Sequence, residues 1–103
     1  ADAIVAACIS IEAVGRTFNV CSGAEVSIKD AVSTIVELCG GQATPLFGAL
    51  PYRDTEICAL SGATSQATQH LGWSASVSLR DGLIKTIEWR RQAASEEPAA
   101  SRN

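Results

Sequence analysis

Few side chains in this sequence have the types and spacing that chemistry requires. The 103 residues include a single histidine, His70. A catalytic histidine needs a nucleophile or a carboxylate that orients it, and the neighbouring Gln66 and Gln69 are weak partners. We therefore interpret His70 as an exposed or helix-capping residue, and we predict no catalytic residue in this chain.

The four cysteines are spread evenly through the chain, at positions 8, 21, 39 and 58. Zinc sites and thioredoxin-like redox motifs are built on closely spaced cysteine pairs, and none occurs here. We predict reduced, mostly buried thiols in a cytoplasmic protein, and no metal site. The glycines form neither a GxGxxG nor a GK sequence, so a glycine-rich phosphate loop is also excluded.

One segment, residues 47–56, is not explained by packing alone. Arg53 follows Pro51 closely on an expected loop, where its guanidinium could bind a phosphate or a carboxylate. Glu56 could accept a hydrogen bond from a ribose hydroxyl or pair with Arg53. The alternative is a solvated arginine beside surface carboxylates, and composition does not decide between these interpretations.

Charge and hydropathy restrict the classes of partner. Eight basic residues against eleven acidic ones give a net charge of −3, without the basic cluster that nucleic acids or anionic membranes require. A hydrophobic content of 47% predicts one folded domain. The longest apolar stretches fall far short of the roughly 20 residues that span a bilayer. We expect neither nucleic-acid binding nor membrane insertion.

The elements that would position Arg53 follow from periodicity and from capping residues. Ser27 with Asp30, and Ser78 with Asp81, are typical of helix N-termini, because the hydroxyl accepts a first-turn N–H bond. Gly72 is typical of a helix end. Helices are predicted at residues 2–14, 28–39, 64–71 and 79–92, a strand at 17–21, and a strand or extended segment at 44–50.

Six short blocks have a recognisable order and spacing. They are GRTFNVCSG (15–23), SIKD (27–30), PYR (51–53) with Glu56, LGW (71–73), SLRDGL (78–83) and TIEW (86–89). The ordered set resembles the C-terminal part of extended short-chain dehydrogenases/reductases, the NAD-dependent nucleotide-sugar epimerases, dehydratases and ketoreductases. The resemblance runs from about residue 2 to residue 92.

This resemblance implies an α/β fold in which residues 1–93 form a substrate-binding lobe, in the order helix, strand, helix, strand, helices. Residues 94–103 would be a disordered tail. The Rossmann core would lie in an N-terminal domain outside this chain, making the chain a fragment. The resemblance places Arg53 on the substrate's pyrophosphate and Glu56 near its ribose. NAD or NADP would be bound by the whole protein and not by this part.

The family's catalytic Tyr-x-x-x-Lys and its dinucleotide fingerprint do not occur in this chain. Tyr52 is the only tyrosine, and the residue four positions later is Glu56. We therefore expect a lobe that binds the nucleotide sugar without catalysing the isomerase, lyase or oxidoreductase step alone. The alternative is a non-catalytic binding or interaction module. Whether the protein forms a homodimer stays open.

Overall fold

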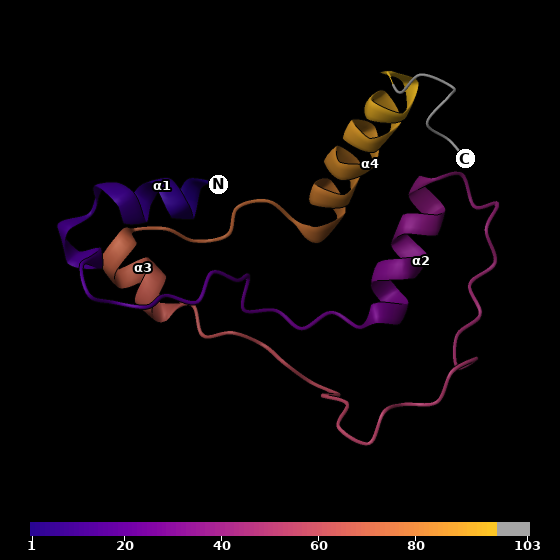
Figure 1. The fold of residues 1–103 in the computed structure, drawn as a ribbon, viewed down its shortest axis with the longest axis horizontal. Coiled ribbons are helices and arrows are strands. Elements are labelled where there is room, and N and C mark those ends of the chain that lie inside the picture. Colours follow the sequence, from indigo (N-terminus) through magenta and orange to yellow (C-terminus); the bar gives the residue numbers. More distant parts are fainter. Residues whose placement is uncertain (97–103) are drawn as a thin grey trace. The chain divides into compact units, whose positions relative to one another are not determined.

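The computed structural model describes residues 1–96, and within that range it consists of helices joined by irregular segments (Figure 1). The α/β prediction is wrong: the described chain is all-α, with no strand in residues 1–96. Its elements in chain order are α1 (Asp2–Ile9), the 3₁₀ helix η1 (Ile11–Ala13), α2 (Ile28–Leu38), α3 (Ser65–Leu71) and α4 (Leu79–Glu96).

Neither the predicted strand at 17–21 nor the predicted strand or extended segment at 44–50 is a strand in the structure; both are irregular. A strand exists only when its backbone N–H and C=O groups pair with a second strand. Within the described residues, no backbone hydrogen bond ties 17–21 to another segment. Residues 44–50 hold only a local bond, from the N–H of Ala49 to the carbonyl of Leu46 at 3.4 Å. The residue types favour strands, but residues 1–96 contain no second strand with which either segment could pair.

The chain divides into two compact units. The first unit combines Ala1–Val26 with Pro51–Ser76, and therefore holds α1, η1, α3 and the loop that carries Arg53. The second unit combines Ser27–Leu50 with the chain from Val77 onward, and holds α2 and α4. Each unit is thus built from two stretches that are distant in the sequence.

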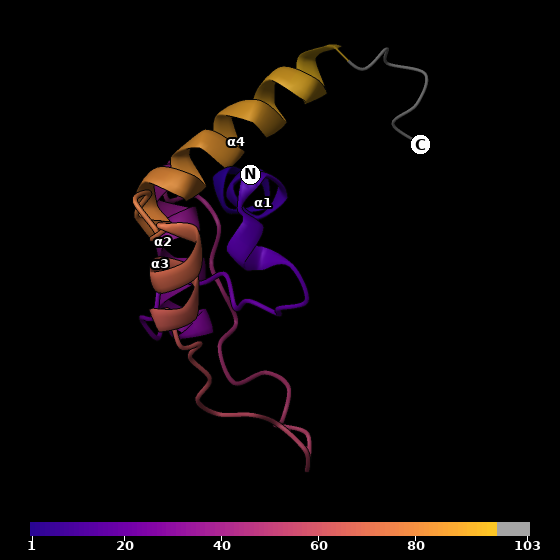
Figure 2. The same ribbon diagram turned by 90° about the vertical axis from the view of Figure 1, so that its left-hand side faces the viewer.

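In the first unit, α1 and η1 pack against α3. Figure 2 shows α1 end-on, running across α3 rather than alongside it. The helix predicted at 2–14 is broken at Ser10, whose backbone is extended with φ −90° and ψ 123°. The hydroxyl of Ser10 donates to the carbonyl of His70 at 3.2 Å, so a contact between distant segments accompanies the break. α3 ends as predicted, at Gly72 with a φ of 62°.

The second unit confirms both predicted N-caps. The Ser27 hydroxyl accepts from the N–H of Asp30 at 3.0 Å at the start of α2. At the start of α4, the Ser78 hydroxyl accepts from the N–H of Asp81 at 3.1 Å and donates to its carboxylate at 2.7 Å. α4 ends later than predicted, so residues 94–96 of the expected tail are helical. The rest of that tail, 97–103, lies outside the described residues.

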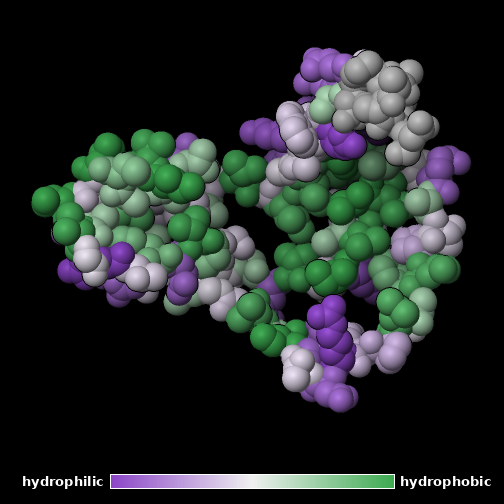
Figure 3. All heavy atoms as spheres, viewed as in Figure 1, coloured by the Kyte–Doolittle hydropathy of each residue, from purple (hydrophilic) through white to green (hydrophobic). Residues whose placement is uncertain are grey.

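Side chains larger than alanine are not fully buried anywhere in residues 1–96, where only Ala3 and Ala67 are buried. Figure 3 shows hydrophobic residues across much of the visible face of the unit that holds α1 and α3. Apolar surface of this extent is typical of a protein that packs against a partner. No helix in the described part has both the length and the hydrophobicity needed to cross a membrane.

Candidate functional site

Arg53 and Glu56 lie at the two ends of one tight turn. The N–H of Glu56 donates to the carbonyl of Arg53 at 3.0 Å, with Asp54 and Thr55 between them. This bond from residue i+3 to residue i is that of a β-turn, which holds the two end Cα atoms within roughly 7 Å. The backbone therefore brings together the two residues that the sequence analysis selected, although it shows no contact between their side chains.

Both side chains of the turn face solvent. The one ion pair in residues 1–96 joins Arg80 to Glu37, so the guanidinium of Arg53 carries no carboxylate partner within the described chain. Neither Asp54 nor Glu56 forms an ion pair with it. An exposed guanidinium with uncommitted donors is able to bind a phosphate through two parallel N–H bonds.

The structure offers no second cation to support Arg53 on its own loop. Residues 51–56 contain Arg53 as their only basic residue, together with Asp54 and Glu56. A diphosphate at this turn would meet one positive and two negative side chains. Any affinity for such a ligand must therefore depend strongly on the single guanidinium.

All four cysteines are free thiols, as predicted. The expectation that they are mostly buried is wrong, because three are exposed and Cys21 is half-buried. Among the described residues, no three His, Cys, Asp or Glu side chains converge in a way that could hold a metal ion.

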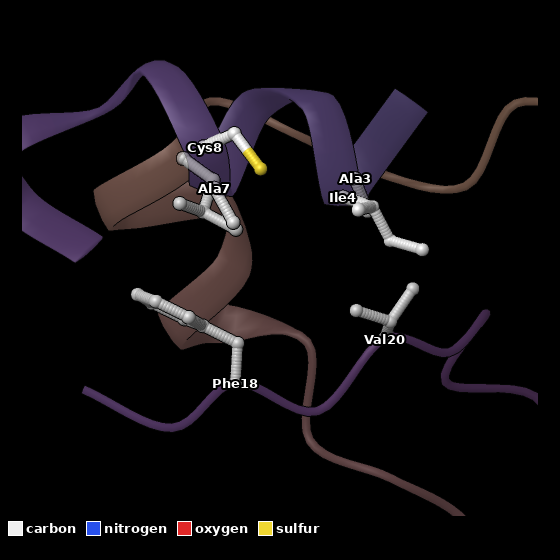
Figure 4. A pocket seen from close by; sticks show the side chains of 7 residues that line it. Ala3, Ile4, Ala7, Cys8, Phe18 and Val20 are labelled. Atoms are coloured by element: carbon white, nitrogen blue, oxygen red, sulfur yellow. The ribbon is translucent and has the colours of Figure 1, made fainter. Parts of the chain in front are cut away.

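An apolar hollow of about 330 Å³ lies within the first unit. Phe18 and Val20 point from the segment after η1 toward α1, where Ile4, Ala7 and Cys8 face them (Figure 4). Its lining consists of Ala3, Ile4, Ala7, Cys8, Phe18, Val20 and Leu71. This hollow was not predicted from the sequence, although the two-residue spacing of Phe18 and Val20 places both side chains on one side of an extended segment.

The same extended segment lies beside residues 60–63, which together with it line a second hollow of about 440 Å³. The approach is closest at Gly62, where a β-carbon would lie 2.5 Å from Sγ of Cys21 and 3.3 Å from its Cβ. A side chain on residue 62 has no room unless Cys21 moves. An alanine at position 62 therefore requires the Cys21 side chain to shift.

His70 occupies the last turn of α3 and is half-buried. Nη1 of Arg16 lies 3.5 Å from Nε2 of His70, and the Phe18 ring lies 6.2 Å from the imidazole, centroid to centroid. The backbone of the same residue receives the Ser10 bond described above. The imidazole of His70 thus contacts Arg16 and Phe18, and neither of them is a carboxylate or a nucleophile.

Within residues 1–96, the clear pKa shifts belong to Glu37 and Arg80, which lie in the second unit. Nη2 of Arg80 contacts Oε1 of Glu37 at 2.8 Å, and Nη1 lies 3.4 Å from Oε2. This paired hydrogen bond, followed by the charge of Arg80, lowers the pKa of Glu37 below its usual range. The same contact raises the pKa of Arg80. Both side chains are more than half exposed, which is typical of a surface ion pair rather than an active site.

Comparison with known proteins gives no relative from which roles could be transferred. The sequence matches no protein-family model, and it shows no detectable similarity to a curated protein or to a solved structure. The functional assignment therefore depends on the residues themselves and on the resemblance of the ordered blocks.

Proposed function

We propose that this chain is the nucleotide-sugar-binding portion of an NAD(P)-dependent epimerase, dehydratase or ketoreductase, with Arg53 binding the nucleotide diphosphate. The observation that carries the proposal is the exposed guanidinium at the start of the 53–56 turn, which lacks a carboxylate partner within the described chain. A guanidinium already paired with Asp54 or Glu56 would have to give up that pair before it could bind a phosphate.

The turn geometry also supports a proposal in which Arg53 binds the diphosphate and Glu56 binds the ribose of the same ligand. Since the backbone bond closes the turn, the side chains of Arg53 and Glu56 start from neighbouring positions. A diphosphate on Arg53 would have its nucleoside ribose within reach of the Glu56 carboxylate. Hydride transfer would need NAD or NADP in an N-terminal Rossmann domain, and this chain supplies substrate binding alone.

The exposed apolar side chains are consistent with such a partner domain. Ile9 is 82% exposed at the end of α1, and Ile11 is 86% exposed in η1. A chain with this surface gains stability when a second apolar surface covers it. The same observation favours the second candidate function, a non-catalytic interaction module, which would need the apolar surface but not the guanidinium.

Calorimetric titration of the intact protein with UDP-, dTDP-, GDP- and CDP-sugars tests the proposal. Arg53→Ala should weaken binding of the preferred nucleotide sugar by about 10- to 150-fold, because one charge-assisted hydrogen bond to the phosphate is lost. Arg91→Ala is the matched control, since it removes an exposed arginine from α4 and should leave the affinity unchanged. Unchanged affinity in Arg53→Ala would remove Arg53 from the site.

A second variant separates the role of Glu56 from that of Arg53. Glu56→Ala should weaken binding by about 2- to 10-fold, as expected for the loss of one hydrogen bond to a ribose hydroxyl. The loss should disappear when the ligand carries 2′,3′-dideoxyribose. If none of the nucleotide sugars binds the unmodified protein, the interaction-module function is favoured instead.

A further inference from the structure

The apolar hollow of the first unit has the size and lining of a small ligand site. Its volume of about 330 Å³ lies at the lower end of ligand pockets, which span roughly 300–1,000 Å³. None of its lining side chains is charged, and the Cys8 thiol is its only polar side-chain group. The part of a ligand that enters this space must therefore be a hydrocarbon.

A cationic side chain, Arg16, is connected to one wall of the hollow through His70. The Phe18 ring forms that wall and also lies 6.2 Å from the ring of His70, centroid to centroid. Nη1 of Arg16 lies 3.5 Å from Nε2 of the same imidazole, and Arg16 precedes Phe18 by two residues in the chain. This contact uses one guanidinium N–H and leaves the others available, and Arg16 has no ion-pair partner among residues 1–96.

We propose that the hollow binds a small amphipathic carboxylate. Its hydrocarbon chain occupies the hollow, and its carboxylate crosses the edge of Phe18 to bind the guanidinium of Arg16. The charge of Arg16 selects an anionic head group, and the planar guanidinium suits the two oxygens of a carboxylate. The contact between Nη1 of Arg16 and His70 leaves the other N–H groups of the guanidinium free for this carboxylate. This site is independent of the nucleotide-sugar site proposed at Arg53.

Titration with hexanoate, heptanoate and octanoate, followed by amide chemical shifts in NMR spectra, tests both halves of the proposal. Affinity should rise about fourfold with each added methylene, because each one leaves water for an apolar surface. Octanol, which has the same chain without the charge, should bind at least several-fold more weakly than octanoate. Affinity that does not depend on chain length, or equal affinity for the alcohol, would overturn the proposal.

Two pairs of variants locate the ligand. Ala7→Leu places extra methyl groups in the hollow and should reduce octanoate affinity by at least tenfold, whereas Ala6→Leu, on the same helix outside the lining, should not. Arg16→Ala should remove the preference for octanoate over octanol, and Arg91→Ala should keep it. The amide spectrum of each variant must retain the folded pattern, which separates loss of the site from loss of the unit.

The hollow has one other natural occupant, a second copy of the chain. Sedimentation of the same variants distinguishes it. If the unmodified protein is a dimer that Ala7→Leu dissociates, and octanoate leaves the sedimentation unchanged, the hollow is a subunit interface and the ligand proposal is overturned. A monomer that binds octanoate supports it.

Discussion

Different kinds of interaction stabilise each of the two units of this chain. The second unit consists of two helices whose starts are specified within four residues of sequence, at Ser27 and Ser78, joined by one exposed ion pair. The first unit depends on contacts between distant segments, among them Ser10 with the carbonyl of His70 and Gly62 with Cys21. Local capping thus defines the helix starts of the second unit, whereas contacts between distant segments stabilise the first unit, which carries the candidate site.

The largest effect is expected where the first unit is packed most tightly. Gly62→Ala should lower the free energy of unfolding by about 1–3 kcal/mol, because the new β-carbon overlaps Sγ of Cys21. Urea unfolding followed by Trp73 fluorescence in a Trp89→Phe background reports on this unit. Cys21→Ala should recover part of the loss, since it removes the sulfur. Equal stability of Gly62→Ala and the parent would show that distant contacts do not control the first unit.

A smaller effect is expected for the local signals of the second unit. Ser27→Ala removes the acceptor of the Asp30 N–H bond and should cost about 1 kcal/mol of stability, seen as lower helix content and an earlier urea transition in circular dichroism. Ser33→Ala is the control, an exposed serine within α2 rather than at its cap. A Ser33→Ala variant as unstable as Ser27→Ala would contradict the capping account.

The smallest effect is expected for the Glu37–Arg80 pair. Because the pKa of Glu37 is lower in the folded chain than in the unfolded one, its stabilising contribution is present above the unfolded pKa and is lost as pH falls through the folded one. The stability difference between the parent and Glu37→Gln should therefore shrink on acidification. Glu88→Gln, an exposed glutamate of α4 outside this pair, should show no such trend. A difference that grows toward acidic pH would contradict this sign.

Features that depend on neighbouring residues are predictable from the sequence, whereas features that depend on distant contacts are not. Both N-caps and the end of α3 at Gly72 are predictable, because each depends on a few neighbouring residues. The break at Ser10 is not, since its hydroxyl bonds to a carbonyl 60 positions away. The strand at 17–21 is wrong because residue types favour extended backbone but cannot supply a second strand.

The candidate site also has one part that is predictable from the sequence and one part that is not. Arg53 and Glu56 were selected from residue chemistry, and the turn that links them is a local feature with Asp54, a residue type common in turns, between them. The hollow and its neighbour Arg16 were missed, because their residues come from α1, the segment after η1 and the end of α3. Only the alternation of Phe18 and Val20 gave a local signal.

The most direct measurement is an amide chemical-shift map of the intact protein titrated with the nucleoside diphosphate of its preferred sugar nucleotide. The account predicts the largest shifts at Arg53 and Glu56, with saturation, and their loss in Arg53→Ala. Shifts confined to α1 and the residues around Val20, or no shifts at all, would contradict diphosphate binding by this turn.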